Sequence, residues 1–160
     1  MELKPIMAVK ETASCERCGS FEVLEHVPAY TRALCELSRC LRPGGTLLLT
    51  VPFILSSATT LTRATIDDAG QVTHLLPPEI HGDPLDDTGA LCFYHFGWDF
   101  LDQLAEVGLE DTSISMFWEP HYGYLGGYQF IITARKQASP KRWASLFRIL
   151  QRAFGASAAL

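Results

Sequence analysis

The stretch that decides the fold is Leu41-Arg42-Pro43-Gly44-Gly45-Thr46-Leu47-Leu48-Leu49-Thr50-Val51-Pro52-Phe53. Residues 46–53 form a short apolar run without alternation, which is typical of a strand buried on both faces of a sheet. Upstream, apolar residues recur at helical spacing over 28–41, with Pro28 in the first turn and Gly44 just past the end. A helix followed by a buried strand predicts an α/β fold with a parallel sheet.

The rest of the chain extends this pattern. Residues 54–93 form a long connection rich in proline, glycine and aspartate, and so long a connection in a compact domain is usually functional or disordered. A second helical stripe over 98–105 is closed by Gly108, which suits the left-handed end of a helix. Two β-rich runs, 113–118 and 128–135, then predict an antiparallel hairpin.

Composition indicates one folded domain. The chain has 160 residues, of which 48% are hydrophobic and 19% charged, as in an ordinary globular protein. No apolar run approaches the roughly 20 residues that span a bilayer, and the start lacks the apolar core of a secretion signal. Five cysteines cannot all pair within one chain, and free thiols suit a reducing cytosol. We therefore expect a cytoplasmic protein.

The charges are distributed unevenly. The net charge is −5, but no acidic residue follows Glu119, and the end of the chain is purely basic. An acidic body would repel phosphate, so we expect no nucleic-acid partner. Residues 137–160 predict a basic amphipathic helix and tail, which we expect to dock on the sheet; contact with a membrane surface is the alternative.

Two segments carry a family resemblance. Residues 20–28, Ser20-Phe21-Glu22-Val23-Leu24-Glu25-His26-Val27-Pro28, resemble the segment after the fourth strand of the class I S-adenosylmethionine-dependent methyltransferases (type 11 methyltransferase domain). Residues 41–49 resemble the entry to that family's fifth strand, and residues 81–84 and 93–99 are similar to a subgroup with an extended loop before its last helix. The resemblance covers residues 20–136.

The resemblance implies both a fold and a function. The fold is a Rossmann-like sheet, mainly parallel with a C-terminal antiparallel hairpin, flanked by helices, in which strands four, five, seven and six are adjacent. The implied activity is methyl transfer from S-adenosylmethionine, the cofactor, to a small-molecule acceptor.

The sequence also departs from the family. The family's cofactor loop is a glycine-rich turn, but Gly19 is the only glycine before Ser20, and residues 12–18 are too polar for a buried strand. We therefore expect a truncated domain, the C-terminal half, preceded by an atypical segment over 1–19. A truncated sheet has an open edge, so we expect self-association, with residues 6–9 covering the edge or pairing with a second copy.

Two hypotheses follow for the function of the chain. In the first it is the substrate-side half of a methyltransferase, incomplete as an isolated enzyme. In the second it is a non-catalytic module that uses its open edge for self-association or for binding a partner.

The cofactor candidates follow from the resemblance. In the family, the methionine and adenosine parts of the cofactor pass the segment after the fourth strand, which implies Phe21, Glu22 and Glu25 as cofactor-binding residues. The alternative is that the two glutamates favour the N-terminus of the following helix and that Phe21 belongs to the core.

The long connection and the residues directly before and after it supply most of the remaining candidates. Methyl transfer is an in-line displacement, in which orientation and water exclusion do most of the work and a base takes the acceptor's proton. The candidate bases are His81 and His95, with hydrogen bonds that order the loop as the alternative. The substrate-binding candidates are His26, Phe53, Asp83 and Trp98. For His26 the alternative is a hydrogen-bonded scaffold, and for the aromatic residues it is the core.

One cysteine pair has the spacing of metal ligands. Cys15 and Cys18 stand three residues apart, as the thiolates of a zinc knuckle do. Structural zinc needs four ligands, and the sequence has no second such pair. We therefore expect free thiols and no metal site.

Overall fold

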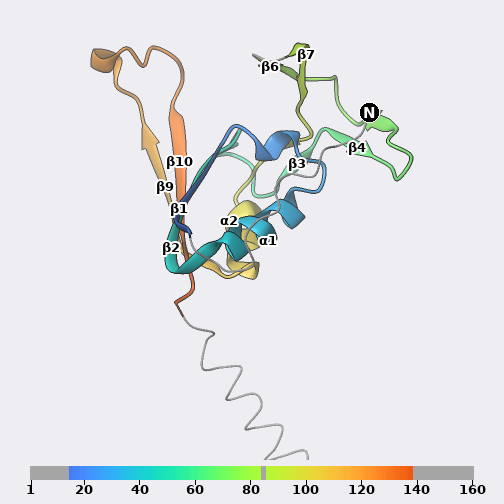
Figure 1. The fold of residues 1–160 in the computed structure, drawn as a ribbon. Coiled ribbons are helices and arrows are strands. Elements are labelled where there is room, and N and C mark those ends of the chain that lie inside the picture. Colours follow the sequence, from blue (N-terminus) through green and yellow to red (C-terminus); the bar gives the residue numbers. More distant parts are fainter. Residues whose placement is uncertain (1–14, 84–85, 139–160) are drawn as a thin grey trace, which may run out of the picture.

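The computed structural model describes residues 15–83 and 86–138. Its centre is a four-stranded sheet in the order β1-β2-β10-β9 (Figure 1). The strands are β1 (Cys15–Phe21), β2 (Leu41–Thr50), β9 (Leu109–Phe117) and β10 (Gln129–Lys136). β1 and β2 are parallel, whereas β10 is antiparallel to both β2 and β9. This order confirms the predicted adjacency of strands four, five, seven and six, although antiparallel pairs predominate in the described sheet.

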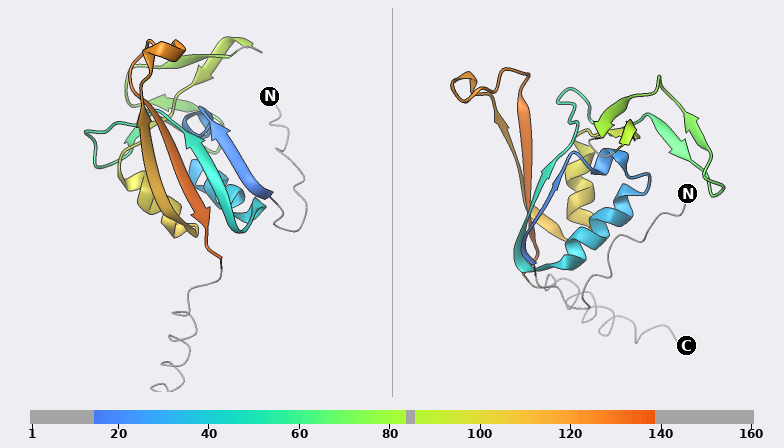
Figure 2. Two further views of the ribbon diagram at one scale, coloured as in Figure 1. Left: turned by 90° about the vertical axis from the view of Figure 1, so that its left-hand side faces the viewer. Right: turned by 45° about the horizontal axis from the view of Figure 1, so that its top comes forward.

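Two helices cover one face of the sheet, as both views in Figure 2 show. They are α1 (Tyr30–Cys40) and α2 (Asp99–Glu106), close to the predicted spans. Leu34 of α1 and Leu104 of α2 belong to one buried cluster with Leu47 and Leu49 of β2. Each leucine buried in this way contributes roughly 1.5–3 kcal/mol relative to an exposed one.

The central strand is buried on one face only. Leu47 and Leu49 are fully buried. Leu48, which lies between them, and Thr50, which follows, are half-buried. The prediction of a strand buried on both faces is therefore wrong for the described residues, in which no helix lies on the second face. The run shows no alternation because leucine occupies positions on both faces.

β1 corrects the predicted start of the fold. Residues 15–21 form a strand, with Gly19 opposite Leu48 and Phe21 opposite Thr50, whereas residues 12–18 were predicted to be too polar for a buried strand. The strand tolerates polar residues because most of it is exposed and, among the described strands, it forms the edge of the sheet. Residues 6–9 and most of the predicted C-terminal helix lie outside the described residues.

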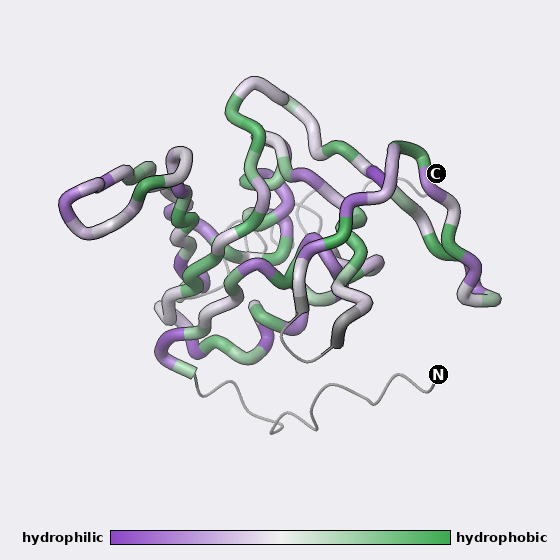
Figure 3. The backbone as a smooth tube through the Cα atoms, turned by 90° about the horizontal axis from the view of Figure 1, so that it is seen from above, coloured by the Kyte–Doolittle hydropathy of each residue, from purple (hydrophilic) through white to green (hydrophobic). Residues whose placement is uncertain are grey.

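The long connection folds into three small ribbons. β3 (Leu61–Thr62) pairs with β8 (Tyr94–His95), β4 (Ala64–Ile66) with β5 (Val72–His74), and β6 (Ile80–Asp83) with β7 (Asp86–Leu91). Seen from above, the β4–β5 ribbon and the connection between β9 and β10, which contains the 3₁₀ turn η2 (Pro120–Tyr122), project on opposite sides of the molecule (Figure 3).

The helix termini are fixed by local chemistry. Gly108 follows α2 with φ +79°, the left-handed geometry that glycine adopts without a steric penalty, and Leu109 behind it is buried. At the other end of α2, Asp99 Oδ1 accepts hydrogen bonds from the backbone N–H and the hydroxyl of Thr60, both at 2.7 Å. These bonds tie the long connection to the helix.

Among the described residues, no helix is long and apolar enough to span a lipid bilayer.

Candidate functional site

The candidate site lies where the parallel strands β1 and β2 end. After Phe21 the chain turns sharply: Glu22 has φ +50°, and its N–H donates to the carbonyl oxygen and the hydroxyl of Thr50, each at 3.1 Å. The 3₁₀ turn η1 (Leu24–His26) follows. Ligands of α/β proteins bind beyond the carboxyl ends of parallel strands, so the turn is placed at the edge where a ligand is expected.

Glu25 is the most unusual residue at this edge. Its side chain is 0% exposed, and neither carboxylate oxygen has a hydrogen-bond partner among the residues that the structure describes. Burial, more than any neighbouring charge, raises the pKa of this carboxyl above its ordinary value. A buried carboxylate without partners is energetically costly, and it therefore marks a place where a positive charge or a proton is needed.

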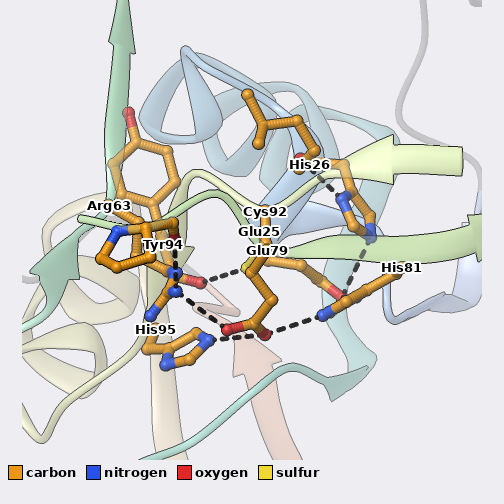
Figure 4. Close-up of polar contacts among 10 residues, drawn as sticks. Glu25, His26, Arg63, Glu79, His81, Cys92, Tyr94 and His95 are labelled. Atoms are coloured by element: carbon orange, nitrogen blue, oxygen red, sulfur yellow. Dashed lines mark hydrogen bonds and ion pairs between the residues drawn. The ribbon is translucent and has the colours of Figure 1, made fainter. Parts of the chain in front are cut away.

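Two histidines face this carboxylate, as Figure 4 shows. His26 Nε2 lies 3.6 Å from Glu25 Oε1, and His81 Nδ1 lies 3.8 Å from the same oxygen. The two imidazole rings meet edge to face with their centroids 4.8 Å apart. The candidates His26, His81 and Glu25, named separately from the sequence, thus come together in one cluster.

The outer nitrogens of both rings are hydrogen-bonded. His26 Nδ1 lies 2.8 Å from the carbonyl oxygen of Leu91. His81 Nε2 lies 3.0 Å from Glu79 Oε1. A carbonyl or carboxylate oxygen can only accept, so each outer nitrogen carries the hydrogen and each inner nitrogen presents its lone pair.

Glu79 organises the long connection. Its Oε1 accepts from His81 and from His95 Nε2, each at 3.0 Å, and its Oε2 lies 3.1 Å from Arg63 Nη2. The hydrogen bond from His81 is the largest cause that holds the pKa of Glu79 below its ordinary value. The sequence prediction missed Glu79, and the available signal was an acidic residue directly after Pro77-Pro78 and two positions before a histidine.

The structure therefore brings His81 and His95 together on one carboxylate. Both histidines make hydrogen bonds that order the loop, which was the alternative to a catalytic role. A role of either one as the base stays a prediction. Each ring is partly exposed, since the side chain of His81 is 31% exposed and that of His95 19%.

The other candidates are distributed around this cluster. Phe21 is 56% exposed, so its assignment to the core is wrong. Glu22 is exposed, and Phe53 and Trp98 form an edge-to-face pair with ring centroids 5.3 Å apart. Trp98 also donates from Nε1 to the carbonyl oxygen of Leu55 at 2.8 Å. The backbone of Asp83 lies in β6, but its side chain is outside the described part of the chain.

The sequence also offers the aromatic run Phe93, Tyr94, Phe96 and Trp98 as the lining of a substrate pocket, with core positions as the alternative. Phe93 and Phe96 are buried, as the alternative predicted. The Tyr94 side chain is half-buried, and its hydroxyl donates to the carbonyl oxygen of Pro28 at 2.6 Å. That bond joins the connection to the segment that precedes α1.

A second group with metal-binding residue types consists of Glu79, Cys92 and His95. Cys92 is fully buried, and its thiol donates to the carbonyl oxygen of Tyr94 at 3.3 Å. Burial raises the pKa of the Cys92 thiol to about 11, so the thiol stays protonated at neutral pH. Metals bind the thiolate form of cysteine, and the Glu79 carboxylate already contacts His81, His95 and Arg63. This group is therefore a weaker candidate for a metal site than Glu25, His26 and His81.

A family match covers about a quarter of the chain, near its start. Residues 7–49 match the model of the methyltransferase domain family. The match contains both segments on which the resemblance rests, 20–28 and 41–49, and thus confirms the resemblance for this part of the chain. It also contains β1, η1, α1 and nearly all of β2. No curated protein matches the chain.

Several solved structures are similar at low identity. A Listeria monocytogenes protein assigned as an S-adenosylmethionine-dependent methyltransferase is 16% identical, with a TM-score of 0.49, and the alignment covers 82% of this chain and 65% of that one. An S-adenosylmethionine-dependent methyltransferase from Mesorhizobium loti is 17% identical, with a TM-score of 0.48 and coverages of 78% and 64%.

A third similar structure contains a ligand. The 1,6-didemethyltoxoflavin-N1-methyltransferase of Burkholderia thailandensis, with bound 1,6-didemethyltoxoflavin and S-adenosylhomocysteine, is 17% identical, with a TM-score of 0.41 and coverages of 74% and 43%. This chain thus spans less than two thirds of the length of all three structures. At these identities and TM-scores, the similarity by itself says nothing about the activity of the chain.

Proposed function

We propose that the chain forms the substrate side of an S-adenosylmethionine-dependent methyltransferase that acts on a small-molecule acceptor. The observation that carries this proposal is the family match over residues 7–49. It spans β1, η1 and nearly all of β2, which contribute Glu22, Glu25 and His26 to the candidate site, and it does not include the long connection. The sheet order β1-β2-β10-β9 agrees with the order that the resemblance implies. Five free cysteines suit a cytoplasmic location.

The residues after β1 fit one wall of a cofactor site. Phe21 and Val23 are 56% and 48% exposed, and they flank the exposed carboxylate of Glu22. An apolar surface beside a well-placed polar group is typical of ligand sites. The two apolar side chains suit the adenosine group of the cofactor, and the Glu22 carboxylate suits its ammonium or hydroxyl groups. The segment between β1 and α1 contains no glycine, so the close backbone approach of the family's loop has no counterpart among these residues.

The proposed chemistry assigns a task to each remaining candidate. The cofactor supplies an activated methyl group, and the protein orients the acceptor, excludes water and takes one proton. Phe53 and Trp98 provide an apolar wall for the acceptor, and Asp83 lies on the β6 strand above the site. His95 or His81, each held by Glu79, takes the acceptor's proton.

The first test is calorimetry of the full chain with S-adenosylhomocysteine. We expect weak binding, with a Kd in roughly the millimolar range, or about −4 kcal/mol, because one wall of the site makes few contacts. Glu22→Gln should weaken binding, whereas Glu106→Gln, an exposed glutamate of α2, should not. Absence of binding at several millimolar ligand would contradict the proposed cofactor site.

The second test follows the methyl group. Because the chain is expected to be incomplete as an isolated enzyme, this test uses a full-length relative that has the glycine-rich cofactor loop, with residues numbered by their counterparts in this chain. With methyl-labelled S-adenosylmethionine and a small-molecule extract, we expect label in the small-molecule fraction. His95→Ala and His81→Ala should lower this transfer at least tenfold before they lower the thermal midpoint, whereas His74→Ala, an exposed histidine of β5, should leave both unchanged. Parallel loss of transfer and stability would rule out a role as base.

A specific observation supports the alternative of a self-association or partner-binding module. Among the described strands, only β2 pairs with β1, so the outer edge of β1 has unpaired backbone groups of the kind that recruit another strand. Sedimentation at micromolar concentration should then show dimers or larger species. A single compact monomer would count against the module.

A further inference from the structure

Glu25, His26 and His81 present three lone pairs to one small space. The outer N–H of His26 donates to Leu91 and that of His81 donates to Glu79, so both inner nitrogens are acceptors. Both face Glu25 Oε1, which is also an acceptor and has no hydrogen-bond partner. With Glu25 ionised and both imidazoles neutral, three lone pairs converge and repel one another, and the described residues place no donor between them. A bound cation would relieve this repulsion and keep the buried carboxyl ionised.

A proton on one imidazole gives an ion pair with Glu25 at these distances, but no hydrogen bond. The separations of 3.6 and 3.8 Å from Glu25 Oε1 to the two nitrogens exceed the range of about 2.7–3.2 Å in which a hydrogen bond forms. A proton can also join only one of the two pairs at a time. The gap is thus too wide for a hydrogen bond on either side.

A metal ion fits the gap better. Bonds of about 2.0–2.1 Å to nitrogen and oxygen place neighbouring ligand atoms of a tetrahedral site roughly 3.3 Å apart. The three candidate ligand atoms lie within 4.8 Å of one another, so modest side-chain rotations close the site. η1 supplies Glu25 and His26, and β6 supplies His81. A bound ion would therefore link the long connection to the turn that follows β1.

The groups behind the histidines are those that metal-binding histidines use. A ligating imidazole usually donates its other N–H to a carbonyl or a carboxylate, which fixes the ring and its tautomer. Here the carbonyl of Leu91 serves His26, and the carboxylate of Glu79 serves His81. Glu79 is itself fixed by Arg63 at 3.1 Å, and Figure 4 shows this outer layer around the three ligands.

We propose that Glu25, His26 and His81 form a binding site for one divalent transition-metal ion. Two imidazole nitrogens and one carboxylate oxygen suit zinc, iron or manganese better than calcium or magnesium, which favour all-oxygen ligand sets. Three protein ligands leave a coordination position open for water or for an oxygen or nitrogen atom of a ligand. The site accounts for the buried charge of Glu25 without a direct contact to a cofactor, and it does not depend on methyl transfer. With the ion bound, both nitrogens of His81 are in use, which leaves His95 as the candidate base.

The test uses zinc and the full chain. Protein stripped with a chelator is dialysed against micromolar Zn²⁺, and the bound metal is measured by atomic emission. We expect about one ion per chain for the wild type and for His74→Ala. His26→Ala, His81→Ala and the shape-preserving Glu25→Gln should each lower the affinity at least tenfold. In metal sites generally, loss of a group that only supports a ligand already costs roughly 10–100-fold in affinity.

Two further measurements distinguish loss of a metal ligand from unfolding of the variant. Circular dichroism of the metal-free variants shows whether each one is folded, and the Co²⁺-loaded wild type should give visible absorption bands that Glu25→Gln changes. The double variant Cys15→Ser/Cys18→Ser should retain the ion. Fewer than one ion per five chains in the wild type, or loss of the ion in the cysteine variant and not in the histidine variants, would overturn the proposal.

Discussion

At the scale of single residues, burial sets chemical behaviour that the sequence does not reveal. Glu25 and Cys92 are both fully buried, yet nothing in their immediate sequence distinguishes them from an exposed glutamate or cysteine. The sequence singled out His81 and His95 because they belong to the loop expected to close over the ligand end of the sheet, and His26 as an imidazole beside that end. It could not predict that His81 faces Glu25, since the two lie 56 positions apart and meet only when the connection folds back over η1.

The thiols provide a prediction at this scale. With its pKa raised to about 11 by burial, Cys92 has about one thiolate in a thousand molecules at pH 8. Alkylation at pH 8 should therefore modify the exposed Cys35 at least a hundredfold faster than Cys92, as measured for each site by mass spectrometry. Equal rates at the two sites would mean that Cys92 is not buried.

Gly97 gives a second prediction at the residue scale. A Cβ atom at this position would lie 2.5 Å from the backbone carbonyl of Thr59, and backbone cannot move aside cheaply. Gly97→Ala should lower the free energy of unfolding by about 1–3 kcal/mol, as overpacking does, in urea titrations. Gly126→Ala is the matched control, because nothing lies within 4 Å of the added atom; an equal effect of both changes would contradict the packing around Gly97.

At the scale of elements, the sequence predicts those whose patterns are strong. The helices α1 and α2 and the β9–β10 hairpin agree with the predicted spans, because their apolar residues follow one period and glycine marks the end of α2. β1 was missed because an exposed edge strand needs no apolar alternation. The ribbons over 61–91 were missed because two- to six-residue strands leave too short a pattern to read.

The central strand gives the prediction at this scale. Leu49 of β2 is 0% exposed and packs beneath the two helices. Leu49→Ala should lower the free energy of unfolding by about 2–5 kcal/mol, from lost burial and the cavity left behind. Leu125→Ala, at a position 79% exposed, should change it by less than about 0.5 kcal/mol. Comparable losses in the two variants would place β2 outside the core.

At the scale of the whole molecule, the fold was predictable from the sequence, but the composition of the candidate site was not. A helix before a leucine-rich strand was enough to predict the α/β arrangement, and the rule that ligands lie at the carboxyl ends of parallel strands gives the position at which we expect the site. Its inner arrangement depends on Glu79 and Leu91, whose hydrogen bonds orient the two histidines. Such long-range partners follow from the folded connection and not from any local pattern.

We propose that the ligand binds at the carboxyl end of β1 and β2. The most direct measurement is a ¹H–¹⁵N NMR titration of the full chain with S-adenosylhomocysteine. We predict that the shifts concentrate at residues 21–26, next to the end of β2, with smaller changes over 79–95. Shifts confined to the opposite end of the sheet, or none at several millimolar ligand, would contradict the account.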